Sequence, residues 1–116
     1  MATDWSDDIA IAELANEPAL SEELNAIIER TGTQHNVPNV VLNFTDVSYL
    51  NSSNIAQLLK LHRLLNEANR RLKLCHVSDE VWSVLMVTGL DKHFQFAPDT
   101  MTALAGLQLD ERESTD

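Results

Sequence analysis

The stretch Val40–Leu59, VVLNFTDVSYLNSSNIAQLL, decides the fold, because a strand pattern changes into a helical pattern within it. The overlapping segment Asn39–Phe44 has adjacent valines and a leucine, which are typical of a strand buried on both faces of a parallel sheet. Residues Thr45–Leu50 are predicted to form a loop, and the polar run Asn51–Asn54 is typical of a helix start. The stretch therefore predicts a strand, a loop and a helix in succession.

The helix predicted from Ser52 to about Arg71 has two different faces. At about 100° per residue, apolar residues and one histidine gather on one side, and charged residues gather on the other. The first side comprises Ile55, Leu58, Leu61, His62, Leu65 and Ala68, and the second comprises Lys60, Arg63, Glu67 and Arg70. We expect the first side to be buried and His62 to be a packed histidine. The second side is expected to be solvated, and its basic residues with Arg71 and Lys73 are an alternative docking patch.

The rest of the chain continues this alternation of strands and helices. Further strands are predicted at Ile9–Leu14, Leu72–Val77 and Phe94–Phe96. Further helices are predicted from Asn16 or Pro18 to Gly32, from an N-cap at Asp79 to Gly89, and from near Pro98 to Leu107. This order predicts an α/β domain with a largely parallel sheet of four or five strands and about four helices.

The length and composition indicate one domain. A chain of 116 residues, 44% of them hydrophobic, can build one core and is too short for two. The charged stretches 1–8 and 110–116 are predicted to be mobile tails around a domain at residues 9–109. The single cysteine, Cys75, allows no disulfide within the chain and is expected to be a small buried side chain.

The net charge of the chain restricts its partners. Eight basic residues against 18 acidic ones give a net charge of −10, and such a field repels nucleic acids and anionic membranes. No apolar run approaches the roughly 20 residues that span a bilayer, and residues 1–8 lack the pattern of a signal peptide. The sequence therefore predicts a cytoplasmic protein that neither binds nucleic acid nor inserts into membranes.

Catalytic and metal-binding patterns are not evident. The four histidines, His35, His62, His76 and His93, lie on different predicted elements without ligand spacing, so neither a metal site nor a cofactor is predicted. Ser52 and Ser53 do not lie in a Gly-x-Ser-x-Gly motif, and no glycine-rich phosphate loop is present. We do not expect an enzyme, and a small enzyme with a serine or cysteine nucleophile is the less favoured alternative.

Two ordered segments resemble a known family. Val40–Leu59 resembles the signature stretch of STAS domains, particularly the stand-alone bacterial anti-sigma factor antagonists, in which a strand leads through a loop to Asp-Ser-Ser/Thr-Gly-Leu. Val84–Phe94, VLMVTGLDKHF, is similar to the next landmark of that family, a helix that ends in Thr-Gly-Leu before a phenylalanine. Together the two segments extend the resemblance over roughly residues 39 to 107.

The resemblance implies a partner-switching phosphoprotein that regulates transcription. Its unphosphorylated form would bind an anti-sigma factor that is also a serine kinase and would thereby free a sigma factor. Phosphorylation would release that partner. The kinase partner, and not this chain, would bind the ATP. A protein phosphatase would be a further partner. The phosphorylated residue maps onto Ser52, with Ser53 as the alternative. The predicted partner-binding residues are Asp46, Ser48, Asn51, Ser52, Ser53 and Asn54.

Two positions depart from the family motif. Asn51 stands where the family has aspartate, which keeps a helix cap and removes a negative charge. Asn54 stands where the family has glycine, so its side chain would change which partner can approach the backbone. The alternatives are therefore a polar cap without a switch, a phosphorylation-independent STAS scaffold, and a subunit of a lipid-transporting ABC complex.

Overall fold

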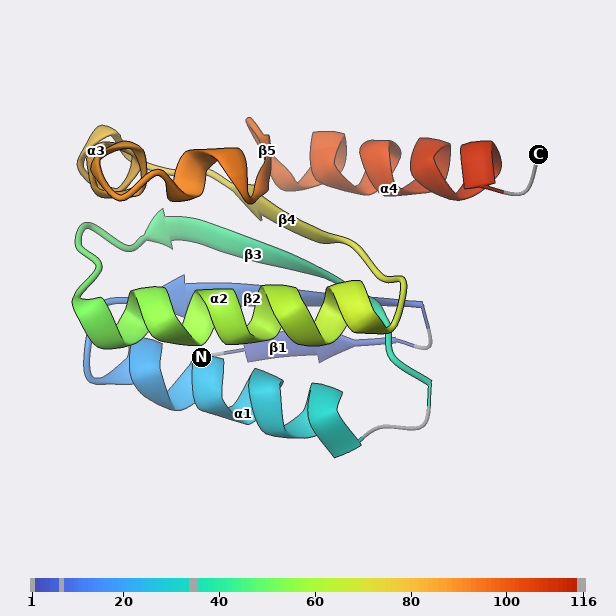
Figure 1. The fold of residues 1–116 in the computed structure, drawn as a ribbon, viewed down its shortest axis with the longest axis horizontal. Helices are drawn as coiled ribbons and strands as arrows, with labels where there is room; N and C mark the ends of the chain where they lie inside the picture. The colour runs from blue at the N-terminus through green and yellow to red at the C-terminus, as the bar shows by residue number, and fades with distance from the viewer. Residues whose placement is uncertain (1, 7, 34–35, 115–116) are drawn as a thin grey trace.

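The computed structural model describes the backbone of residues 2–6, 8–33 and 36–114. The strands are β1 (Ala2–Trp5), β2 (Ile9–Ala15), β3 (Asn39–Asp46), β4 (Leu72–Cys75) and β5 (Gln95–Ala97). The helices are α1 (Ala19–Thr33), α2 (Ser52–Glu67), α3 (Asp79–Val87), the short 3-10 helix η1 (Leu90–Lys92) and α4 (Thr100–Ser114). The predicted α/β fold is confirmed, with a five-stranded, mostly parallel sheet and four α-helices (Figure 1).

The strands lie in the sheet in the order in which they occur in the chain, β1-β2-β3-β4-β5. Strands β2 to β5 are parallel, and β1 pairs antiparallel with β2. Each crossover therefore advances in the same direction across the sheet, and right-handed crossovers place their helices on one face. The carboxyl ends of the parallel strands, and the loops that follow them, consequently share one edge of the sheet.

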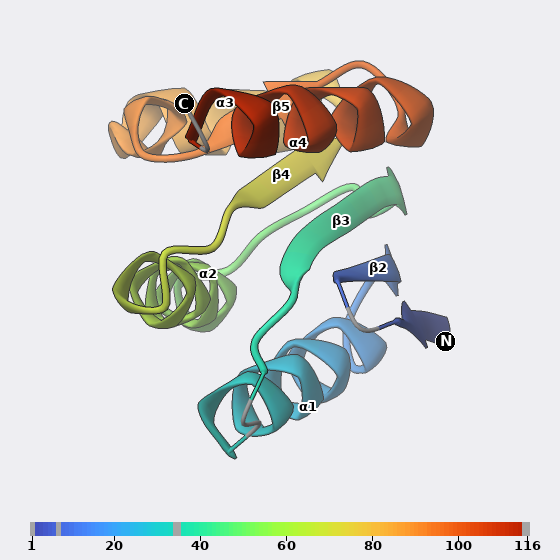
Figure 2. The ribbon, with the colours of Figure 1, turned by 90° about the vertical axis from the view of Figure 1, so that its right-hand side faces the viewer.

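The sheet separates two hydrophobic clusters. Helices α1 and α2 lie together on one face (Figure 2), where Leu24 and Leu58 are fully buried in a cluster that includes Leu42 of β3. On the other face, Val41 of β3 packs with Leu107 of α4 in a smaller cluster. Strand β3 is thus buried on both faces, as its sequence predicts.

The prediction of a mobile tail over residues 1–8 is wrong for residues 2–5. These residues form β1, with Thr3 opposite Ala12 and Trp5 opposite Ala10 of β2. The Arg30 guanidinium of α1 lies 4.0 Å from the centre of the Trp5 ring, an arrangement that a cation–π attraction favours. Contacts with β2 and α1, rather than any local pattern, hold this strand at the edge of the sheet.

The ends of several elements differ from those predicted. Helix α2 ends at Glu67 and not near Arg71, because Asn69 adopts a left-handed conformation with φ of 59°. Strand β4 stops at Cys75, and the N-cap of α3 is Ser78 rather than Asp79. Helix α4 continues to Ser114, so its backbone is helical through much of the predicted charged tail.

Cys75 and His62 take the packed positions that the sequence predicts. Cys75 is fully buried in the smaller cluster, and this burial raises the pKa of its thiol. His62 is half-buried, and its ring lies edge-on to the ring of Phe94 with 5.4 Å between centroids. His35, one of the four histidines considered above, lies outside the described residues.

Two further observations concern the described ranges alone. No helix there combines the length and the apolar character that crossing a bilayer requires. Among the side chains that the structure describes, no three His, Cys, Asp or Glu residues come close enough together to hold a metal ion.

Candidate functional site

A β-bulge begins the candidate site at the end of β3. Glu13 pairs with Asn43 and Ala15 with Asp46, so β3 contains one more residue than β2 over this interval. The side chain of Asn43 supports the bulge, because its Oδ1 accepts hydrogen bonds from Thr45 N at 2.9 Å and Thr45 Oγ1 at 2.6 Å. Bulges bend a strand locally, and this one directs the chain into the loop before α2.

The loop between β3 and α2 is held by two buried side chains and by hydrogen bonds to the loop after β2. Val47 and Leu50 are each 2% exposed, and they fix the loop to the core. Ser48 is held by Asn16 in the loop after β2, since Asn16 Oδ1 accepts from Ser48 N at 2.9 Å and Asn16 Nδ2 donates to Ser48 Oγ at 3.0 Å. Between these anchors Tyr49 remains 64% exposed.

Helix α2 begins with a capping box made of two asparagines. Asn51 is the N-cap, and its Oδ1 accepts from Asn54 N at 2.8 Å. In return, Asn54 Oδ1 accepts from Asn51 N at 3.0 Å. Two otherwise unpaired backbone N–H groups at the helix start are thereby satisfied. The capping role that the sequence predicts for this polar run is confirmed.

The capping box leaves two serine hydroxyls unused. Ser52 and Ser53 occupy the first two positions of α2, and both are exposed. Among the described residues, none hydrogen-bonds either hydroxyl. Asp46 and Ser48 are also exposed, whereas Asn54 is fully buried and shapes the site from beneath the surface. Four of the predicted site residues are therefore accessible, whereas Asn51 is half-buried and Asn54 is an internal support.

A carboxylate that sequence reasoning missed completes the site. Glu17, in the loop after β2, accepts at Oε2 from Asn51 Nδ2 at 3.3 Å and from Asn54 Nδ2 at 3.4 Å. Its other oxygen accepts from Ser21 N at 2.6 Å, and Ser21 Oγ also donates to the carboxylate. The hydrogen bonds from Ser21, and to a smaller extent those from Asn54 and Asn51, hold the pKa of Glu17 below its ordinary value.

The same network joins the starts of α1 and α2. Asn54 Nδ2 lies 3.3 Å from Ser21 Oγ and 3.3 Å from Gln57 Oε1. Gln57 Nε2 donates to Ser21 O at 3.0 Å and to Asn25 Oδ1 at 2.9 Å. The positive ends of two helix dipoles consequently lie side by side with the Glu17 carboxylate between them.

This arrangement can display hydroxyls and accept an added anion. A phosphate on Ser52 or Ser53 would lie beside the positive end of α2, where a negative charge is stabilised. In the described part of the chain no base is hydrogen-bonded to either serine, which a serine nucleophile would require. Both hydroxyls are exposed at the start of α2.

Comparisons with known proteins agree with this fold. A family model described as the STAS domain matches residues 13–103, and a search of curated proteins found no match. An anti-sigma-factor antagonist (STAS) domain protein from Planctomyces limnophilus aligns with a TM-score of 0.78 at 17% identity, over 92% of this chain and 97% of that one. A variant of RsbS from Moorella thermoacetica aligns with a TM-score of 0.80 at 14% identity, over 96% and 97%.

A phosphorylated relative has the same fold. The Bacillus cell fate determinant SpoIIAA in its phosphorylated form aligns with a TM-score of 0.65 at 20% identity, over 84% of this chain and 91% of that one. At these identities the structural likeness establishes the fold, and the family assignment rests on the family model. Since that model matches most of the sequence, from residue 13 to residue 103, this chain belongs to the STAS domain family.

Proposed function

We propose that this chain is an anti-sigma factor antagonist that changes partners when Ser52 is phosphorylated. The observation that carries the proposal is the exposed, unengaged Ser52 hydroxyl at the first position of α2. Ser52 lies within the segment that resembles the family motif, and the family model covers it. Ser53 is equally accessible and is the alternative acceptor.

The electrostatics of the site support a switch that leaves the fold intact. A phosphate adds about −1.5 to −2 charges, and at a helix N-terminus it gains about 0.3–1 kcal/mol from the dipole. The same charge at a packed interface is desolvated and repelled by carboxylates of a partner. Phosphorylation should therefore weaken binding without unfolding the domain.

The partner in this proposal is an anti-sigma factor of the serine-kinase type, which supplies the ATP. A protein phosphatase would restore the unmodified serine. The chain itself acts as a binding protein rather than an enzyme, and its compartment is the cytoplasm. Exposed Asp46, Ser48 and Tyr49 in the loop before α2 would form the rim of the docking surface.

A phosphorylation-independent STAS scaffold, such as a subunit of a lipid-transporting ABC complex, is the second candidate. It is favoured by Asn51 and Asn54, which differ from the aspartate and glycine of the motif. In that case the capping box would serve only to fix the loop for a permanent partner.

One experiment separates the two candidates. The partner is recovered by affinity capture, the pair is incubated with ATP, and phosphate is mapped by mass spectrometry on wild type, Ser52→Ala and the matched control Ser53→Ala. Phosphate that disappears only in Ser52→Ala supports the switch. A stable complex in which neither serine is modified would support the scaffold instead.

A further inference from the structure

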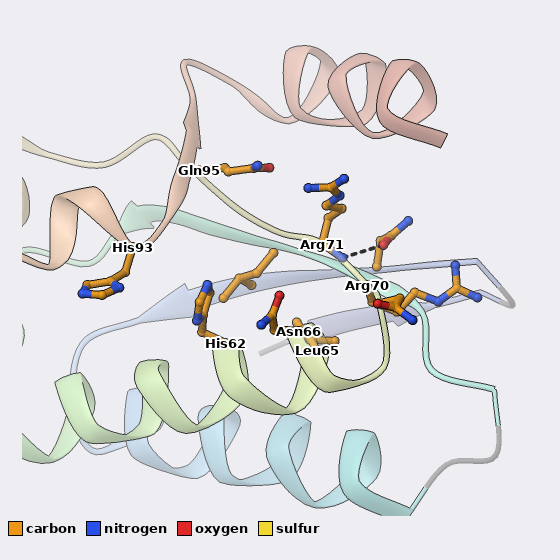
Figure 3. A pocket seen from close by; sticks show the side chains of 10 residues that line it. His62, Leu65, Asn66, Arg70, Arg71, His93 and Gln95 are labelled. Carbon is orange, nitrogen blue, oxygen red and sulfur yellow. Dashed lines mark hydrogen bonds between the residues drawn. The ribbon is translucent and has the colours of Figure 1, made fainter. Parts of the chain in front are cut away.

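A polar cavity lies near the end of α2 that is opposite to Ser52. Its volume is about 540 Å³, and its lining includes His62, Asn66, Arg70, Arg71, His93 and Gln95 (Figure 3). We call it the arginine groove. Its size falls within the range of about 300–1,000 Å³ that is typical of small-molecule sites.

The charge of the arginine groove is opposite to that of the chain. The net charge of the protein is −10, yet two arginines and two histidines line this cavity and no aspartate or glutamate does. Among the side chains that the structure describes, which end at Gln108, no carboxylate lies within ion-pair distance of the Arg70 or Arg71 guanidinium. Within that part of the chain neither guanidinium group has a neutralising carboxylate, so the cavity can attract an anion.

The backbone beneath the two arginines is fixed. The left-handed residue Asn69 ends α2, and Arg70 N then donates to Leu65 O at 2.8 Å. Arg71 N donates to Asn39 Oδ1 at 2.8 Å, which ties this turn to the first residue of β3. The backbone of both cavity-lining arginines is consequently fixed by contacts that do not use their side chains.

Polar side chains continue along the cavity away from the arginines. In Figure 3 the labelled residues follow one another from Arg70 and Arg71 past Asn66 to His62 and His93. The two imidazole rings lie edge to face with 6.5 Å between centroids. Carboxamides and imidazoles can hydrogen-bond hydroxyl groups, so this part of the cavity suits a polyhydroxylated ligand.

We propose that the arginine groove binds a phosphorylated sugar. The guanidinium groups of Arg70 and Arg71 bind phosphate oxygens, for which their planar donor geometry is suited. Asn66, Gln95 and the two histidines bind the hydroxyl groups of the sugar. Inorganic phosphate alone would leave most of the cavity unfilled, so the organic part contributes to the affinity.

The proposal is tested by titrating the purified protein with fructose bisphosphate and following backbone amides by NMR and heats by calorimetry. We expect shifts at His62, Asn66 and His93, and a dissociation constant of about 1 mM or lower. Fructose and inorganic phosphate, measured separately, should each bind at least about tenfold more weakly, because each lacks one set of contacts.

A charge-matched pair of variants distinguishes a site from a diffuse field. Arg70→Gln/Arg71→Gln should weaken binding of fructose bisphosphate by tenfold to roughly a hundredfold. Lys60→Gln/Arg63→Gln removes the same charge from exposed positions of α2 outside the cavity and should change binding less than about twofold.

Three outcomes would overturn the proposal. The first is no response to fructose bisphosphate at about 10 mM. The second is an equal loss in both double variants, which would indicate general electrostatics. The third is inorganic phosphate binding as tightly as the sugar phosphate, which would indicate unspecific anion retention. Thermal melts of both variants establish that each is folded, so a loss of binding is interpretable.

Discussion

The side-chain amide of Asn51 donates a hydrogen bond to the Glu17 carboxylate over 3.3 Å, although 34 residues separate the two in the sequence. The family motif that this segment resembles has an aspartate at position 51. Here a carboxylate reaches the start of α2 from the neighbouring loop instead. The N-cap residue that precedes Ser52 is therefore in contact with a negative charge from another loop.

Adding a carboxylate at position 51 and removing the one at position 17 tests the contact between Asn51 and Glu17. We expect Asn51→Asp to lower the free energy of unfolding at neutral pH, because the new carboxylate would lie against Glu17 and repel it. Adding Glu17→Gln should recover much of the loss, since an amide would then face the new carboxylate. Urea denaturation of the two single variants and the double variant measures the coupling. Additive effects would show that the two side chains do not interact.

Glu17 also predicts a pH dependence. Its folded pKa is lowered, so its contribution to stability is present above its ordinary value of 4.5 and is lost as the pH falls through the folded value. The difference in unfolding free energy between wild type and Glu17→Gln should therefore shrink below about pH 4.5. Urea titrations across an acidic pH series check this. A difference that grows on acidification would contradict the hydrogen bonding of Glu17.

The proposed switch predicts a separation of binding from stability. Ser52→Asp should weaken binding to the captured partner strongly, whereas Ser52→Ala should bind constitutively and resist phosphorylation. Both variants should melt close to wild type, because the Ser52 side chain is exposed and makes no hydrogen bond to the described residues. Calorimetry and thermal melts measure the two effects, with Ser53→Asp as the control. Equal binding by Ser52→Asp and wild type would favour the scaffold.

The two sides of α2 predict different costs of mutation. Leu58 and Leu65 are at most 1% exposed, and Leu58→Ala and Leu65→Ala should each destabilise by about 2–5 kcal/mol. Lys60→Ala and Arg63→Ala change exposed side chains and should stay within about 0.5 kcal/mol. Denaturant midpoints at constant m-value provide the measurement. Similar costs on both sides would be incompatible with the observed packing.

The fold could be predicted where burial sets a period along the chain. Leu58, Leu61 and Leu65 recur at helical spacing because one side of α2 faces the sheet. Strand β1 could not be predicted in this way, since Ala2–Trp5 has no apolar alternation and contains Asp4. Its position depends on backbone pairing with β2 and on the contact between Trp5 and Arg30.

The site could be predicted only as far as its contacts are local. Asn51 caps a helix three residues from Asn54, and cap-forming residues at that spacing are a sequence signal. Asn16 and Glu17 meet their partners across 32 to 37 residues, so no local pattern reveals them. The available clue was that loops after adjacent parallel strands share one edge of the sheet.

The match between strand order and chain order also bears on how the molecule assembles. Every strand pairs only with the strand before or after it in the sequence, so no pairing waits for a distant segment to be synthesised. Contacts of short sequence separation cost less loop entropy and speed folding. We therefore expect the sheet to grow one β-α unit at a time from the amino-terminal side as the chain leaves the ribosome, with α4 closing the second face last.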